Sequence, residues 1–136
     1  MATPKYRSGL ERRVIADLEK RGVEFEYEPY PFPYLTKVRE GVCPCCGSPN
    51  VYQHHWYTPD LVFPNGVYVE IKGKFTGVMR SKMLAVKKHN QDVSFRMLFQ
   101  TDNWISKKKL SRYSDWCEKN GFIYHVGEQV PESWVQ

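Results

Sequence analysis

The stretch from Tyr57 to Lys72 constrains the fold more than any other part of this 136-residue chain. Two runs with apolar side chains at alternate positions flank Pro64-Asn65-Gly66, a sequence suited to a three-residue hairpin loop. The proline and asparagine would form a type I turn, and Gly66 would take the left-handed conformation that follows it. We therefore predict a β-hairpin with strands at 57–63 and 67–72.

The loop length determines which residues face each other. A three-residue loop pairs Phe63 with Val67, Leu61 with Val69 and Asp60 with Glu70. One face then carries the apolar residues Leu61, Phe63, Val67, Val69 and Ile71. The opposite face carries Asp60, Val62, Tyr68, Glu70 and Lys72. A two-residue loop would mix these sets, so the clean separation favours the three-residue register.

Two carboxylates directly opposite each other in a hairpin repel unless a cation or a proton lies between them, because their Cβ atoms are only about 5 Å apart. A divalent cation would remove this repulsion. Lys72, on the same face as Glu70, could then orient or help deprotonate a water, or stabilise charge on an attacked phosphate. The alternative is an ion-pair cluster on a solvated sheet face, with Lys72 bridging the two acids.

The order of residues in the hairpin favours catalysis over the ion-pair cluster. Pro59-Asp60, followed across the hairpin by Glu70-Ile71-Lys72, is the complete PD-(D/E)xK signature of nucleases in its correct structural context. We predict that Asp60 and Glu70 hold Mg²⁺ (or Mn²⁺), with the carbonyl oxygen of Ile71 as a further ligand. Oxygen donors suit such a hard cation.

Hydrophobic periodicity predicts the remaining elements. Helices are expected at Ser8–Arg21, Val78–Asn90 and Ser106–Asn120, and further strands at Val23–Tyr30, Val93–Phe99 and Phe122–Val126. The strand at 23–30 should end at the prolines that begin at Pro29, where a loop follows. Together with the hairpin, these elements predict a single α/β domain over residues 1–136, with a mixed β-sheet flanked by helices.

Composition narrows the partners of this domain. The chain has 20 lysine and arginine residues against 15 acidic ones, and this net charge of +5 favours an anionic partner such as nucleic acid. The candidate DNA contacts are Arg7, Arg12, Lys74, Arg80, Lys107 and Lys108. A solvated helix face would explain the lysines at 107–109 equally well. With no membrane-spanning run and no signal-peptide pattern, we expect a cytoplasmic protein.

A cysteine-rich insertion occupies residues 37–55. Cys43-Pro44-Cys45-Cys46-Gly47 has the CPxCG form of a zinc knuckle, in which two thiolates at C-x₂-C spacing hold one ion. We predict a structural Zn²⁺ bound by Cys43, Cys46, His54 and His55, a donor set that zinc prefers. Neighbouring residues on an extended chain point in opposite directions, so one histidine could be a bystander, and Cys45 is an alternative ligand.

Beyond the hairpin, the chain resembles the bacteriophage endonuclease I family of Holliday-junction-resolving nucleases over nearly its whole length. The segments that carry the resemblance are Arg7–Glu11, Gly22, Phe25–Glu28, Tyr57–Asp60, Pro64–Gly66, Val69–Gly73 and Cys117–Lys119. The resemblance implies a restriction-endonuclease-like fold and a Mg²⁺-dependent endodeoxyribonuclease of the crossover junction type. A phage-encoded protein of this kind would act in the host cytoplasm.

Two further expectations rest on this resemblance alone. Glu11 of the family's RSGLE segment would join the metal-binding set, although Ser8-x-x-Glu11 is also a capping box in which Glu11 would merely satisfy a backbone N–H. Family members are intertwined, domain-swapped homodimers, so Glu11 would act in trans to Asp60, Glu70 and Lys72. The zinc insertion would then lie in the segment that bridges the two halves of the dimer.

Three functions remain open from the sequence. The first is a structure-selective endonuclease that resolves branched DNA such as four-way junctions. The second is a restriction-like or nicking endonuclease that acts on linear duplex DNA. The third is a non-catalytic, zinc-bearing module that binds nucleic acid.

Overall fold

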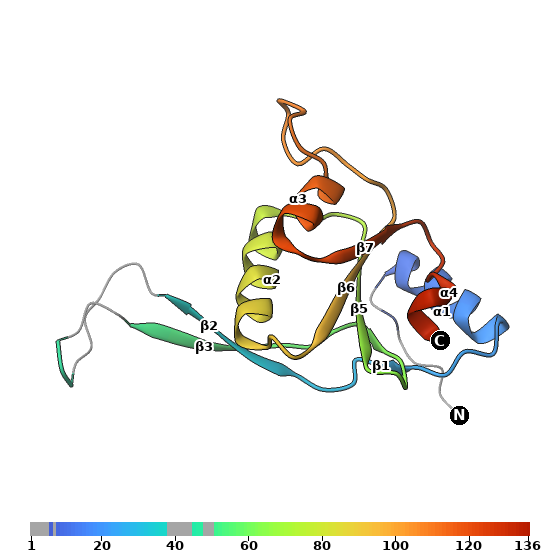
Figure 1. Ribbon diagram of the computed structural model, residues 1–136, viewed down its shortest axis with the longest axis horizontal. Helices are drawn as coiled ribbons and strands as arrows, with labels where there is room; N and C mark the ends of the chain where they lie inside the picture. The colour runs from blue at the N-terminus through green and yellow to red at the C-terminus, as the bar shows by residue number, and fades with distance from the viewer. Residues whose placement is uncertain (1–5, 7, 38–44, 48–50) are drawn as a thin grey trace.

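The structure is a computed structural model that describes residues 6, 8–37, 45–47 and 51–136. Its main body is a five-stranded sheet in the order β1 (Glu26–Tyr27), β4 (Leu61–Val62), β5 (Val67–Lys72), β6 (Ser94–Phe99) and β7 (Ile123–Val126). A separate two-stranded ribbon of β2 (Phe32–Lys37) and β3 (Tyr52–Tyr57) projects to one side of this body (Figure 1).

The main sheet is mixed, as predicted. Strands β1, β4 and β5 pair antiparallel, whereas β5, β6 and β7 pair parallel. The core on one face is shared with α1 (Gly9–Lys20) and α4 (Glu132–Val135), and that on the other with α2 (Gly77–His89) and α3 (Tyr113–Asn120) (Figure 1). None of the helices in the described part of the chain is long and apolar enough to cross a membrane.

The predicted hairpin register is confirmed. Leu61 pairs with Val69, the Phe63 N–H donates to the Val67 carbonyl at 3.0 Å, and Gly66 has the left-handed φ of +85°. The apolar face of the hairpin is buried against the first helix in a cluster that includes Val14, Ile15 and Leu18 of α1. This packing holds the polar edge of the hairpin in a fixed position relative to α1.

Of the other predicted elements, some match the structure closely and others are shorter than predicted. Helices α1 and α2 and strands β5, β6 and β7 match within one residue at each end. The strand expected at 23–30 is reduced to Glu26–Tyr27, because Glu28 has φ of +47° and ends the extended backbone. The first hairpin strand is reduced to Leu61–Val62, and Tyr57 belongs instead to β3.

The ribbon corrects the prediction for the segment after Tyr30. We expected a loop from the prolines onward, but Phe32–Lys37 pairs antiparallel with Tyr52–Tyr57 over its full length. Pro33 is tolerated because β2 has a single neighbouring strand and needs no second row of hydrogen bonds. Because the two strands are far apart in sequence, a local hydrophobic periodicity cannot predict their pairing.

The helix expected at Ser106–Asn120 is wrong in its first half. Helix α3 begins at Tyr113, where Asp115 accepts the Arg112 N–H at 2.8 Å and so caps the first turn. Ahead of it, Lys109 has φ of +53°, a conformation that an α-helix excludes. The capping contact therefore fixes the helix start seven residues later than the lysine-rich sequence suggested.

Candidate active site

Three buried carboxylates come together where α1, β4 and β5 adjoin. Glu11 lies in the first turn of α1, Asp60 immediately precedes β4, and Glu70 lies within β5. Among the described residues they are the only buried charged side chains, with exposed fractions of 6%, 4% and 4%. Burying an ionised carboxylate is costly unless it is paired or neutralised. The cluster therefore requires a cation or protons.

Asp60 lies immediately before β4, and its side chain reaches across the hairpin to β5. Its Oδ2 accepts the backbone N–H of Ile71 at 2.7 Å, so the side chain takes the place of a strand partner. The N–H and C=O of one residue in an extended strand point to the same side. The Ile71 carbonyl therefore faces the same side as the Asp60 carboxylate.

Glu70 is held by two neighbours. The Tyr57 hydroxyl donates to its Oε2, and Lys72 Nζ lies 3.2 Å from its Oε1. Lys72 is 29% exposed, so its ammonium joins the buried acid to the solvent. Lys82 Nζ lies 5.1 Å from the centre of the Tyr57 ring, on the same side of the site. Sequence reasoning assigned neither Tyr57 nor Lys82 to the acids, and the only signal for Tyr57 was its position three residues before Asp60.

At Glu11 the structure shows the Ser8 half of the predicted capping box and a carboxylate that lies near Asp60. Its N–H donates to Ser8 Oγ at 3.1 Å, so Ser8 caps α1 as the Ser-x-x-Glu spacing predicts. Its carboxylate accepts a hydrogen bond from the Tyr27 hydroxyl at 2.8 Å and contributes repulsion at Asp60. Within this single chain, Glu11 therefore lies at the same cluster as Asp60 and Glu70.

The pKa values of the buried acids Asp60 and Glu70 are raised. Burial, followed by repulsion from Glu70, raises the pKa of Asp60 from 3.8 to about 8, against the opposing effects of the Ile71 N–H and Lys72. Burial also raises the pKa of Glu70, although Lys72 and the Tyr57 hydroxyl oppose it. At neutral pH the pair therefore favours a shared proton or an added cation.

The alternative of an ion-pair cluster on a solvated sheet face does not fit this environment. Asp60 and Glu70 are buried, and the single lysine in contact with Glu70 leaves both acids with raised pKa values. A surface ion pair would instead lower them. The arrangement matches a site that is completed by a further positive group.

The donor set suits a hard divalent cation. No group of three or more histidine, cysteine, aspartate or glutamate side chains in the described part of the chain is arranged as a ready-made metal site. Oxygens of Asp60 and Glu70 are engaged instead by Ile71, Tyr57 and Lys72. All the candidate donors are oxygens, however, and burial raises the pKa values of both acids despite the nearby Lys72. The residues therefore fit Mg²⁺ or Mn²⁺ once they exchange these contacts.

The candidate zinc ligands are only partly within the described residues. Cys43 lies outside them, and Cys46 is exposed. His54 and His55 are neighbours in β3, so their side chains point to opposite faces of the ribbon. His55 stacks on Tyr34 with ring centres 5.0 Å apart and bonds the Thr36 hydroxyl at 2.7 Å. The four-ligand set therefore stays a prediction, and the strand geometry favours one histidine as the ligand.

The candidate DNA contacts lie on several elements. Arg7 is outside the described residues, and Arg12 is exposed on α1. Lys74 is exposed between β5 and α2, and Arg80 is half-buried and donates to the Phe75 carbonyl. Lys107 and Lys108 are exposed in the loop before α3. Their role in binding DNA stays a prediction.

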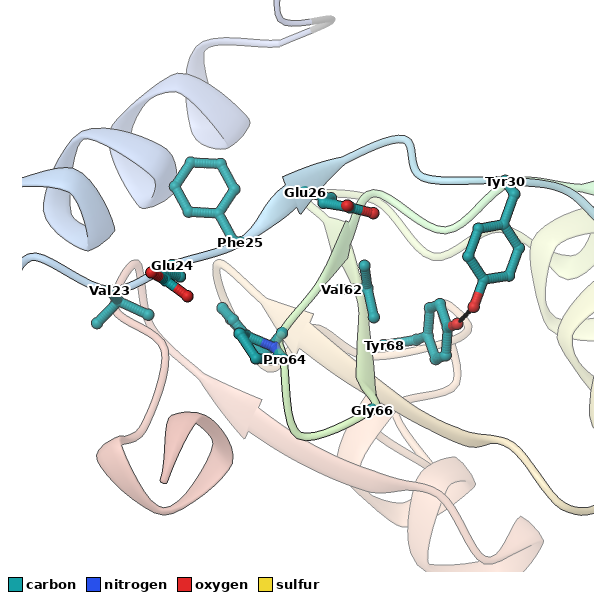
Figure 2. A pocket seen from close by; sticks show the side chains of 10 residues that line it. Val23, Glu24, Phe25, Glu26, Tyr30, Val62, Pro64, Gly66 and Tyr68 are labelled. Carbon is teal, nitrogen blue, oxygen red and sulfur yellow. Dashed lines mark hydrogen bonds between the residues drawn. The ribbon is translucent and has the colours of Figure 1, made fainter.

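A cavity of about 720 Å³ lies apart from the acids, beside β1 and the tip of the hairpin (Figure 2). Glu24, Glu26 and Pro64 are among its lining residues, and the hydroxyls of Tyr30 and Tyr68 meet at one end (Figure 2). None of the clustered carboxylates lines it. We therefore locate the site by its charge and hydrogen bonding and not by the size of a cavity.

Comparison with known proteins identifies relatives of the whole chain. The family model described as phage endonuclease I matches residues 1–136. The chain is 33% identical to "Endonuclease I" of Escherichia phage T7 over 132 residues, which covers 96% of this chain and 78% of that protein. It is 31% identical to "Endodeoxyribonuclease 1" of Enterobacteria phage T3, with 96% of this chain and 77% of that protein covered.

The raised pKa of Asp60 predicts how the stability of the metal-free protein depends on pH. An acid whose pKa is higher in the folded state binds its proton more tightly when folded, so this group opposes folding increasingly as pH rises from about 4 to about 8. Asp60→Asn should therefore stabilise the protein in EDTA by about 2 kcal/mol or more at pH 8, and by much less at pH 4.

Urea unfolding at several pH values measures this effect, and the exposed Asp92 provides the matched control, Asp92→Asn. The control should leave the pH dependence as in the wild type. An Asp60→Asn variant with the wild-type pH dependence would show that this carboxyl titrates normally, contrary to our account.

Proposed function

The chain belongs to the phage endonuclease I family, and on that premise we propose that it is a structure-selective endonuclease that resolves branched DNA such as four-way junctions. Homology to the two phage enzymes makes the chain an endodeoxyribonuclease. The observation that carries the finer proposal is the buried group of Glu11, Asp60 and Glu70 beside Lys72, on the hairpin that bears the PD-(D/E)xK signature.

The acids would hold Mg²⁺ or Mn²⁺, with the Ile71 carbonyl as a further ligand. When bound, the cation would polarise the attacked phosphate and lower the pKa of a water that attacks it. Asp60 and Glu70 would release their excess proton to admit the ion, because the cation would offset the cost of burial that raises their pKa values. The cost of burying these acids in the free protein is thus recovered on binding.

The other residues of the site would stabilise charge on the phosphate and position the carboxylates. Lys72 reaches from Glu70 to the solvent, so its ammonium can approach a phosphate and stabilise the charge that develops on it. The Tyr57 hydroxyl fixes one oxygen of Glu70, and the Tyr27 hydroxyl fixes one oxygen of Glu11. Both tyrosines are positioning residues, since each acts through the carboxylate it holds.

The DNA would be bound through its backbone and its shape. Net positive charge and the exposed side chains of Arg12, Lys74 and Lys108 supply phosphate contacts, with Arg7, Arg80 and Lys107 as further candidates. No motif for reading base edges is present in the sequence. Recognition by shape is what a nuclease for branched DNA requires.

A domain-swapped homodimer would place two such sites on one junction. Glu11 and Asp60 are separated in sequence by the β2–β3 ribbon, which projects from the body (Figure 1). If the ribbon connects two halves of a dimer, the contacts made here within one chain would be made between Glu11 of one subunit and Asp60 of the other. Two sites related by symmetry could then make paired cuts across a branch.

The insertion at residues 37–55 would bind Zn²⁺ through Cys43 and Cys46, completed by His54 and His55 or by one of them and Cys45. Support comes from the CPxCG spacing and from the position of both histidines in β3, on the strand that leaves the insertion. The ion would replace a hydrophobic core in this small segment. Its role is therefore structural, and it would stiffen the ribbon.

Removing either acid should abolish cleavage without abolishing binding. Asp60→Ala and Glu70→Ala should each lower the rate of junction cleavage in Mg²⁺ at least about a hundredfold. Binding to the same junction in EDTA should persist, because neither acid is proposed to touch DNA directly. Unchanged cleavage by both variants would refute a nuclease site at this hairpin.

The same assay distinguishes the candidate substrates. A four-way junction and a linear duplex of the same sequence are compared at equal salt, since phosphate contacts depend steeply on salt. The wild type should cleave the junction much faster than the duplex. Equal rates, or faster duplex cleavage, would favour the restriction-like alternative over junction resolution.

Mixing two inactive variants tests the swapped dimer. Glu11→Ala and Glu70→Ala subunits, unfolded and refolded together, should form heterodimers that regain one intact site if Glu11 acts in trans. Nicking activity should then recover to a sizeable fraction of the wild-type value. If Glu11 acts within its own chain, every site in the mixture lacks one acid and activity stays at the level of the separate variants.

Elemental analysis of the purified protein tests the zinc site. One zinc per chain is expected for the wild type, and Cys46→Ser should lose it along with several degrees of melting temperature. Cys45→Ser distinguishes the two ligand sets: it should retain the ion if both histidines complete the site, and lose it if Cys45 is a ligand. A wild-type protein with no stoichiometric zinc would remove this part of the proposal.

A further inference from the structure

The segment between β6 and α3 forms a projecting finger, residues 102–112, above α3 (Figure 1). Its two arms pair with each other: Trp104 and Arg112 form an antiparallel bridge, and the Ile105 N–H donates to the Ser111 carbonyl at 2.8 Å. The finger is therefore a short hairpin of defined shape and not an irregular loop.

The base of the finger is tied to the first turn of α3. The Asp102 carboxylate accepts the Ser114 N–H at 2.9 Å and its hydroxyl at 2.6 Å. The Arg112 guanidinium lies 4.1 Å from the centre of the Trp104 ring and donates to the Asp102 carbonyl at 3.0 Å. These contacts hold the finger in place before any partner binds, which reduces the entropy lost on binding.

The tip of the finger combines positive charge with an apolar side chain. Lys107–Lys109 occupy the turn, which is closed by a hydrogen bond from the Lys109 N–H to the Ser106 carbonyl at 3.1 Å. Leu110 follows directly and is 78% exposed. A single exposed leucine is ordinary on a protein surface. The distinguishing feature of Leu110 is its place beside three lysines at the end of a pre-formed projection.

The finger leaves the sheet at the edge where the candidate active site ends. Strands β5 and β6 are parallel neighbours in which Lys72 is opposite Phe99, and the Gln100 N–H donates to the Lys72 carbonyl at 3.2 Å. The base of the finger at Asp102 follows two residues later. A DNA arm whose phosphate lies at Lys72 would therefore pass the side of the molecule from which the finger rises.

We propose that the finger is a second DNA-binding element, in which Lys107–Lys109 bind the phosphates of a duplex arm and Leu110 packs against bases exposed at a branch point. Charge complementarity selects DNA as the occupant. Apolar side chains flanked by basic ones can insert at base steps that are easily unstacked, and a branch point offers such steps. This inference rests on the proposed function, since it assigns the substrate's branch point to the finger.

Binding measurements with the full-length protein in EDTA test the finger. The probes are a four-way junction with 2-aminopurine beside the branch point and a linear duplex of the same sequence. The variants are Leu110→Ser and the pair Lys107→Gln with Lys108→Gln. The matched controls are Ile123→Thr, an exposed apolar position on β7, and Lys119→Gln, an exposed lysine on α3.

Leu110→Ser should weaken junction binding about tenfold, abolish the rise in 2-aminopurine fluorescence and leave duplex binding unchanged. The double lysine variant should weaken both complexes and lower the slope of log affinity against log salt by about 2. Both controls should behave as the wild type. The different effects of the two variants separate base packing from phosphate binding.

Junction binding and fluorescence that are unchanged in Leu110→Ser would overturn the proposal. A Leu110→Ser protein that binds DNA normally but loses self-association would assign the tip to a contact between copies, and would also overturn it. If the wild type itself does not prefer the junction, the proposed function fails together with the finger. A wild-type preference that survives in both variants removes the finger alone.

Discussion

Burial of two facing carboxylates is the constraint on which the rest of the site depends. Asp60 and Glu70 lie opposite each other across the hairpin, both nearly inaccessible to water, with only Lys72, among the described residues, in direct ionic contact with Glu70. Surrounding hydrogen bonds hold the carboxyl oxygens, and burial raises the pKa values of both acids so that the pair favours retaining a proton at neutral pH. The folded protein thus bears the free-energy cost of burying two acids with too little positive charge nearby, and a divalent cation can offset that cost.

The fold brings the clustered acids together from separate elements. The apolar face of the hairpin packs on α1 and so brings Glu11 to Asp60, while the β2–β3 ribbon ends at Tyr57, whose hydroxyl holds Glu70. Each acid therefore has its own anchor: a backbone N–H for Asp60, a tyrosine for Glu70 and a tyrosine for Glu11. Such anchoring keeps the acids oriented while their net charge changes.

Sequence patterns predicted the features of the fold that depend on neighbouring residues. The turn chemistry of Gly66 and the two-residue alternation fixed the hairpin register, and Ser8 marked the start of α1. The contacts that failed prediction are non-local. The ribbon pairs strands across the cysteine segment, and the hydroxyls of Tyr27 and Tyr57 reach acids on other elements, which no periodicity records. The lysine-rich run before α3 was misjudged because a cap at Arg112, set by Asp115, outweighs helix propensity.

Calorimetric titration of the metal-free protein with Mn²⁺, in two buffers of different ionisation enthalpy, tests the central claim that the buried acids exchange a proton for a divalent cation. Our account predicts saturable binding near neutral pH, accompanied by release of up to about one proton per site, because Asp60 is largely protonated before the ion enters. The Asp60→Asn, Glu70→Gln double variant should lose both the binding and the proton release. Binding that is absent from the wild type, or equally strong in the double variant, would contradict the account.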